Sequence, residues 1–343
     1  MNIKLEYNLP PIISFLHHAY PLGIFWDENN DNVKAWFCIN YNYLFSITQG
    51  KYFFNFLVNY KDNPFLFIKY KLDHELKEQL LNKELSVLIL ENLSHNYYIE
   101  LLIDDYHLSK STRYKKVHTV HEIFINGIDM INKVYNAWTY ENGIYKELEI
   151  SFHEIVPYYN SFYYDDSNII MKLYYRKEST FIFSKEVFLI QINNYVESIN
   201  PYKYIAPFGS YDRYRNRVFG ISAYQFLFEE FKMNICKGID VRYLRVLYEH
   251  FASMKIKLKN FEQLNVLFTL QKELIKFYDF AEVEARSALR MGVKYNIKQP
   301  VENTEYFYKI INKLHDLISK ETSVLNFFVS SNMDILCNKN IEF

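Results

Sequence analysis

The sequence predicts an α+β protein in which an antiparallel sheet is followed by a helical bundle. Residues 85–150 contain short runs of apolar, β-branched and aromatic residues separated by turn residues, a pattern typical of strands joined by hairpins. The second half lacks proline between Pro207 and Pro300 and glycine between Gly238 and Gly292, and its apolar residues recur every three or four positions. Each apolar stripe needs a partner, so we expect long antiparallel helices that pack on one another.

The composition narrows the class of protein. With 343 residues, half of them apolar, the chain is long enough for two hydrophobic cores. Its net charge is −1 and its basic residues are scattered, so nucleic acid is not an expected partner. No uninterrupted apolar run is long enough to span a membrane, and the first residues lack the apolar core of a signal peptide. A cytoplasmic location is therefore predicted.

The three cysteines, Cys38, Cys236 and Cys337, are odd in number and far apart in the sequence. They form no Cys-x-x-Cys pair, and the histidines do not complete a zinc-binding pattern. We therefore expect neither a disulfide framework nor a metal site, and no cofactor.

The N-terminal half is predicted to begin with a strand within Ile3–Leu9 and a helix from Pro11 to about Phe25. Proline has no amide hydrogen, so Pro11 suits the first turn of this helix, whereas Pro21 would kink or end it.

The segments that follow differ in how clearly they are predicted. Trp36–Phe45 and Tyr52–Val58 fit either strands or short buried helices, because such short aromatic runs show no clear period. Asp73–Glu84 is predicted as a helix capped by Asp73. The predicted strands after it are Leu85–Leu93, Tyr97–Ile103, His121–Ile128, Lys133–Tyr140, Ile144–Ile150 and Asn168–Tyr175.

Two local signals flank the predicted strand Ile144–Ile150. Glu141-Asn142-Gly143 has the residues of a tight hairpin turn. Ser151 is predicted to cap a short helix that runs through Tyr159, with Glu154 as the partner in a capping box.

The C-terminal half is predicted to contain a helix from Asp240, a second that carries the stripe from Leu267 to Ala288, and a third after Pro300. The boundary between the halves is expected between Tyr164 and Lys185. The chain would then consist of an α+β domain over residues 1–175 and an all-helical domain over residues 185–335.

The segment Tyr114–Asp129 is the strongest candidate for a chemical site. His121 precedes the apolar run Ile123–Ile125, and Gly127 follows it, so the imidazole is predicted at the start of a buried strand. A general base commonly occupies such a position. The alternative is a structural histidine that hydrogen bonds to a backbone carbonyl.

Several short strings resemble the family of proteins like butirosin biosynthesis protein H, whose N-terminal domain is similar to a papain-type cysteine peptidase turned acyltransferase. The strings are His18–Leu22, Trp36-Phe37 with Asn40-Tyr41, Tyr97–Tyr106 with Tyr114–Lys116, His121–Asp129, and Asp240–Arg242 with Tyr248–His250. The resemblance implies a papain-like first half. It also implies transfer of an acyl group from a carrier-protein thioester to an amine, during the biosynthesis of a secondary metabolite such as a nonribosomal peptide.

The resemblance further implies a nucleophilic thiol at the start of the first helix, a histidine on the facing strand and an orienting side chain on the next strand. His121 takes the second role. At the place expected for the cysteine the chain has Ser14, whose hydroxyl is much harder to ionise, and the only thiol in this half is Cys38. Asn136 is the candidate for the orienting side chain.

Two functions therefore remain open from the sequence. One is an active acyltransferase that uses His121 with Cys38 or Ser14. The other is a catalytically silent relative, a pseudoenzyme that binds a carrier protein, a partner enzyme or an acyl product. The expected partner is an acyl or peptidyl carrier protein bearing phosphopantetheine. A carrier is typically acidic, and Arg213, Arg215 and Arg217 form the candidate basic patch.

Other marked residues have structural interpretations. Asp104 and Asp105 are neighbours on a strand, so their side chains should diverge, and a solvated loop end is expected. His118 is an odd number of positions from His121 and would face the other side of the sheet. Glu249-His250 is expected to form a buried ion pair or to act in function.

Overall fold

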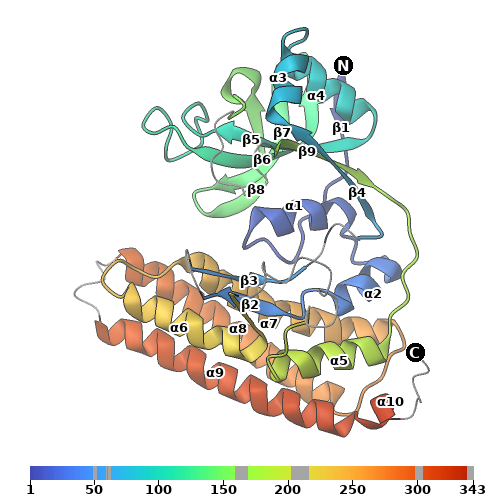
Figure 1. Ribbon diagram of the computed structural model, residues 1–343, viewed down its shortest axis with the longest axis vertical. Coiled ribbons are helices and arrows are strands. Elements are labelled where there is room, and N and C mark those ends of the chain that lie inside the picture. Colours follow the sequence, from blue (N-terminus) through green and yellow to red (C-terminus); the bar gives the residue numbers. More distant parts are fainter. Residues whose placement is uncertain are drawn as a thin grey trace. The chain divides into compact units, whose positions relative to one another are not determined.

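A computed structural model describes residues 1–48, 52–58, 60, 63–158, 169–201, 216–297 and 304–337 (Figure 1). The chain forms two compact units. Unit 1 comprises Met1–Trp26 and Asn59–Thr180, and unit 2 comprises Asp27–Val58 and Phe181–Phe343. The boundary was expected between Tyr164 and Lys185; unit 1 ends at Thr180, and Asp27–Val58 belongs to unit 2.

Unit 1 is built on a seven-stranded antiparallel sheet. Its strands are β1 (Asn2–Lys4), β4 (Leu66–Leu72), β5 (Tyr97–Asp104), β6 (Val120–Asp129), β7 (Val134–Glu141), β8 (Ile144–Ser151) and β9 (Ile169–Arg176). The order across the sheet is β4-β9-β5-β6-β7-β8, and β1 pairs with β6. The predicted hairpin turn is confirmed, since Asn142 and Gly143 both have the positive φ that a tight two-residue turn requires.

The helices of unit 1 are α1 (Leu16–Phe25), α3 (Asp73–Leu80) and α4 (Leu85–Ser94), and a 3₁₀ turn covers Phe152–Glu154. Pro21 lies inside α1 and does not end it. The capping box of Ser151 and Glu154 is confirmed, although the helix it opens is a single turn and does not continue to Tyr159.

The strand predicted over Leu85–Leu93 was wrong, because this segment is helix α4. Its buried apolar residues are Leu88, Ile89 and Leu93; Ile89 and Leu93 are four positions apart and Leu88 adjoins Ile89, so all three lie on one helix face. A short apolar run does not distinguish a strand from a buried helix by period, and here packing on the sheet decides.

The two faces of the sheet are covered differently. Ile99, Leu101 and Ile103 of β5 belong to an aliphatic core that continues into α3 and α4. On the other face α1 packs on aromatic rings, and Tyr20 stacks on Phe124 with a centroid distance of 5.0 Å. Figure 1 shows α3 and α4 on one side of this sheet and α1 on the other.

Unit 2 is a helical bundle with a small sheet. Its helices are α2 (Asp31–Ile39), α5 (Lys185–Val196), α6 (Ala223–Met233), α7 (Val241–Gln263), α8 (Gln271–Ile297), α9 (Thr304–Ser331) and α10 (Asp334–Cys337). Helix α8 packs against both α7 and α9 (Figure 1). Helix α7 begins where it was predicted, and Asp240 caps it, since its side chain accepts a hydrogen bond from the amide of Arg242.

The prediction that this part is all helical was wrong. β2 (Leu44–Ile47), β3 (Phe53–Phe56) and β10 (Arg217–Phe219) form a three-stranded antiparallel sheet in the order β10-β2-β3. The physical reason is a pairing between distant segments: β10 from the second half of the chain pairs with β2 from the first.

Candidate functional site

His121 is the second residue of β6. It pairs with Ile103 of β5, and directly paired residues of an antiparallel sheet point to the same face. Ile103 belongs to the aliphatic core, so His121 is turned to the face that α3 and α4 cover. At this end of the sheet 22% of the His121 side chain remains exposed. The imidazole is therefore partly buried but still reaches solvent.

The two ring nitrogens of His121 have different partners. Nδ1 lies 3.2 Å from Oδ1 of Asp105, and Nε2 lies 3.4 Å from Oγ1 of Thr139, whose side chain is fully buried. The contact to Asp105 has the length of an ion pair but not the angle of a hydrogen bond, and neither atom has a hydrogen-bond partner among the described residues. A carboxylate, an imidazole and a hydroxyl thus lie in sequence, the order of groups in a proton-transfer site.

Asp105 follows the last residue of β5, and its side chain is almost completely buried. Its Oδ2 accepts a hydrogen bond of 2.9 Å from the hydroxyl of Ser111 and lies 3.7 Å from Nη1 of Arg113. Burial alone would raise the pKa of Asp105, but its contacts with His121, Ser111 and Arg113 outweigh burial and lower this pKa below its ordinary value. The carboxylate is therefore ionised at neutral pH beside the imidazole.

Asp104 forms a second acid–histidine pair. Its Oδ2 lies 2.6 Å from Nδ1 of His118, and its Oδ1 accepts hydrogen bonds from the amides of Tyr106 and Thr119. Asp104 and Asp105 diverge, as expected of neighbours on a strand, and each meets a different histidine. Both carboxylates are buried, so they are not the solvated loop end that was expected. His118 precedes β6, and most of its side chain is exposed.

Asn136 does not lie beside His121. It pairs with Gly127, which is six positions from His121 along β6, or about 20 Å at about 3.3 Å per residue. In addition, an added Cβ on Gly127 would press against the side chain of Asn136, so this asparagine closely approaches the neighbouring strand. The side chain that lies beside Nδ1 of His121 is that of Asp105.

Ser14 is buried and lies just before α1, next to Ile13, whose carbonyl accepts a hydrogen bond from the hydroxyl of Tyr140. The helix itself packs at Phe124 through Tyr20. Phe124 is three positions from His121, so strand alternation turns these two side chains to opposite faces. This differs from a papain-like site, in which the opening helix and the histidine border the same cleft.

Cys38 lies in α2 of unit 2, whereas His121 lies in unit 1. Its side chain is completely buried, and its Sγ lies 3.7 Å from the backbone oxygen of Lys257. Burial raises the pKa of the Cys38 thiol to about 12. A nucleophilic cysteine needs the opposite shift, so the environment of Cys38 is that of a core residue.

The candidate basic patch is described only in part, because Arg213 and Arg215 lie outside the described residues. Arg217 opens β10, and its guanidinium lies 4.8 Å from the ring centroid of Phe45, with which it stacks within unit 2.

His250 belongs to a buried polar network that joins five helices of unit 2. Its Nε2 lies 2.7 Å from Oε1 of Glu321, a residue of α9, and not from its neighbour in the sequence. The carboxylate of Glu321 also accepts hydrogen bonds from the hydroxyls of Tyr195, Tyr224 and Tyr278, on α5, α6 and α8. All five side chains are buried, so the network holds the helices in register.

Asp105 and Thr139 were not predicted as site residues. The orienting side chain was expected on β7, the strand after His121, but the carboxylate that lies beside His121 belongs to Asp105, which follows the last residue of β5. The signal that identifies it is the pairing of β5 with β6, because antiparallel pairing places the end of one strand beside the start of the other. The same reasoning applies to β7, whose last residues lie near the start of β6 and include Thr139.

No protein-family model matches this chain, and no curated protein matches it. None of the described helices combines the length and the hydropathy needed to cross a bilayer. Within the described ranges, no three His, Cys, Asp or Glu side chains form a group that could hold a metal ion.

Proposed function

We propose that unit 1 carries a general acid–base site in which His121 transfers the proton and Asp105 orients the imidazole. The observation that supports this proposal is the sequence of contacts from Asp105 through His121 to Thr139. An ionised carboxylate beside Nδ1 favours the tautomer with hydrogen on Nδ1. The lone pair of Nε2 then accepts the proton of a substrate, and the carboxylate stabilises the resulting imidazolium.

The reaction that we propose is the transfer of an acyl group from a carrier-protein thioester to an amine. The family resemblance supports this reaction class. The amine nitrogen attacks the thioester carbon, so a C–N bond forms and the C–S bond breaks. His121 takes one proton from the amine and returns it to the departing thiolate, which leaves as a thiol. The step needs no cofactor.

The positions of the candidate nucleophiles favour direct attack by the amine on the thioester over a covalent acyl-enzyme intermediate. The Cys38 thiol is buried in unit 2 with a raised pKa. Ser14 precedes a helix that packs on the other face of the sheet, and the hydroxyl of Thr139 is fully buried. The papain-type resemblance thus enters the proposal through the acid–histidine pair and not through the nucleophile.

The experiment measures thiol release from acyl-pantetheine thioesters in the presence of a panel of primary amines. We expect His121→Ala to lower the rate at least about a hundredfold, since general acid–base catalysis contributes about 10² to 10⁴. Cys38→Ala should retain most of the rate. His118→Ala is the matched control, because this histidine is also paired with an aspartate but lies outside the proposed site. A full rate in His121→Ala contradicts the proposal.

A second candidate is a silent binding module, which one observation favours. Thr139 lies against Nε2, and less than a quarter of the His121 side chain is exposed, so the proton-accepting nitrogen is partly covered. This candidate predicts that an acylated carrier protein binds without turnover. Its affinity would be the same for the wild type and for His121→Ala.

A further inference from the structure

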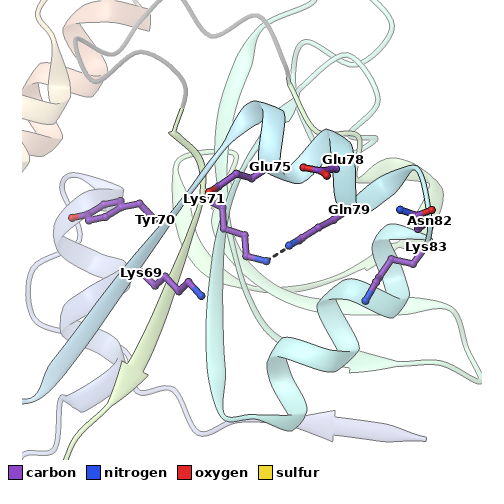
Figure 2. Close-up of a pocket in the computed structure, with 8 residues that line it drawn as sticks. All are labelled: Lys69, Tyr70, Lys71, Glu75, Glu78, Gln79, Asn82 and Lys83. Atoms are coloured by element: carbon purple, nitrogen blue, oxygen red, sulfur yellow. Dashed lines mark hydrogen bonds between the residues drawn. The ribbon is translucent and has the colours of Figure 1, made fainter.

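A pocket of about 500 Å³ lies between the edge strand β4 and helix α3 of unit 1. Figure 2 shows Lys71 reaching from β4 toward Gln79 of α3, with Asn82 and Lys83 beyond the end of the helix. The complete lining is Lys69, Tyr70, Lys71, Glu75, Glu78, Gln79, Asn82 and Lys83. A volume of this size is in the range of small-molecule sites.

Two lysines of this pocket occupy positions that neighbouring strands fill with core residues. Lys69 pairs with Leu173 and Lys71 pairs with Met171 of β9, and both partners belong to the aliphatic core. Directly paired residues share a face, so these lysines extend the core face at its edge. Only 9% of Lys71 is exposed.

The ammonium groups of the pocket are incompletely neutralised. Nζ of Lys71 donates a hydrogen bond of 2.8 Å to Oε1 of Gln79. This acceptor is neutral and engages only one of the three ammonium hydrogens of Lys71. Lys83 is paired with Glu91, at 2.6 Å, outside the pocket lining. Lys69 makes no ion pair and no hydrogen bond within the part of the chain that the structure describes.

Neither acidic residue of the pocket, Glu75 or Glu78, forms an ion pair with Lys69 or Lys71 among the described residues. Oε2 of Glu75 instead accepts a hydrogen bond from the amide of Leu72. Burial lowers the pKa of Lys71, and the charges of Lys69 and Lys83 lower it further, against the opposing effect of Glu75. An anion in the pocket would reverse this balance, because it would take the remaining donors of Lys71 and those of Lys69.

We propose that the pocket between β4 and α3 binds a small phosphorylated metabolite, with Lys69 and Lys71 holding its phosphate group. A phosphate monoester carries about two negative charges and several acceptor oxygens, which match two neighbouring ammonium groups. Glu78 and Asn82, on the helix side, provide an acceptor and an amide for the hydroxyl groups of the organic part. This site is separate from the proposed proton-transfer site of His121.

The competing explanation is that the lysines protect the free edge of the sheet. Among the described strands β4 pairs only with β9, and inward-pointing charges on an edge strand prevent pairing with another chain. This explanation predicts aggregation after removal of the lysines and no specific affinity for phosphate.

The test titrates the full-length protein with ribose 5-phosphate, inorganic phosphate and unphosphorylated ribose by isothermal titration calorimetry. We expect a dissociation constant of about 1 mM for ribose 5-phosphate, weakening with added salt, and no binding of ribose. Lys69→Met should weaken binding at least about tenfold, since one charge-assisted contact is lost. Lys69 is exposed, so this variant should fold. Lys77→Met, an equal charge change on the exposed side of α3 and outside the lining, is the matched control.

Three results would overturn the proposal. The first is no saturable binding of ribose 5-phosphate to the wild type, and the second is equal affinity in Lys69→Met and Lys77→Met. The third is a soluble wild type without affinity together with an aggregating Lys69→Met, which would assign the lysines to edge protection. Binding of inorganic phosphate as tight as that of ribose 5-phosphate supports the phosphate contacts and removes the role of Glu78 and Asn82.

Discussion

Lys257 provides a quantitative test of burial in unit 2. Its side chain is fully buried in α7, and Nζ donates to Oδ1 of Asn42 at 2.6 Å. Burial lowers the pKa of Lys257 to about 7, against an ordinary value near 10.4. Between pH 7 and about pH 10 the unfolded chain therefore holds this proton and the folded chain does not. Raising the pH through this window stabilises the fold.

The size of the effect follows from about 1.4 kcal/mol per pH unit for one proton. Because the folded pKa is near 7, the free energy of unfolding should rise by about 2 kcal/mol between pH 7 and pH 9. The range stops at pH 9 because Cys38 has the opposite effect on stability at higher pH. Its pKa is near 9 in the unfolded chain and raised in the folded chain, so above pH 9 the unfolded thiol ionises and the fold loses stability.

The assay is urea unfolding followed by circular dichroism at 222 nm, which reports mainly on the long helices of unit 2. With a slope of about 2 kcal/mol per molar urea, the wild-type midpoint should rise by about 1 M from pH 7 to pH 9. Lys257→Met should remove this rise. Lys259→Met, on an exposed position of the same helix, should keep it. An equal rise in Lys257→Met and the wild type, or a falling wild-type midpoint, refutes the reasoning.

Three further predictions concern single side chains. Glu321→Ala should destabilise unit 2 by about 4 kcal/mol, because it removes the acceptor shared by four buried donors. Glu321→Gln should destabilise it less, and the midpoints of urea unfolding measure both effects. Asp105→Asn should weaken unit 1 at neutral pH and reduce its acid sensitivity. The stability that a carboxylate with a lowered pKa contributes is fully present above about pH 4 and is lost as the pH falls through its folded pKa. The free energies of unfolding of the wild type and of Asp105→Asn should therefore converge at low pH. Gly220→Ala should lower the melting temperature more than Gly143→Ala. Both glycines have positive φ, but an added Cβ on Gly220 would collide with a backbone oxygen, whereas the space around Gly143 is open.

The hairpins of unit 1 could be predicted because their signals are local. Alternating side chains mark β5 to β8, and Asn142-Gly143 specifies the turn between the last two. Helix α4 could not be separated from a strand, because its apolar run is too short to show a period. The placement of Asp27–Val58 in unit 2 depends on the pairing of β2 with β10, which no local signal predicts.

The candidate site shows the same division. His121 was identified from its own neighbours, since an apolar run and a glycine follow it in β6. Asp105 and Thr139 reach it only through the register of β5, β6 and β7, and register is a property of the folded sheet. Cys38 was considered because the first half has no other thiol, but its helix belongs to the core of unit 2.

Exposure separates the polar groups that serve structure from those available for chemistry. The Glu321 network and Lys257 are fully buried, and their partners are other buried groups, so a substrate has no route to them. His121 and Lys69 differ, because each keeps access to solvent beside a buried polar neighbour. A reacting or binding group needs both conditions, since the buried neighbour sets its charge and direction while the exposed side admits the ligand. On this physical ground the chemistry of the described chain is expected in unit 1, and unit 2 uses its buried charges to fix the packing of its helices.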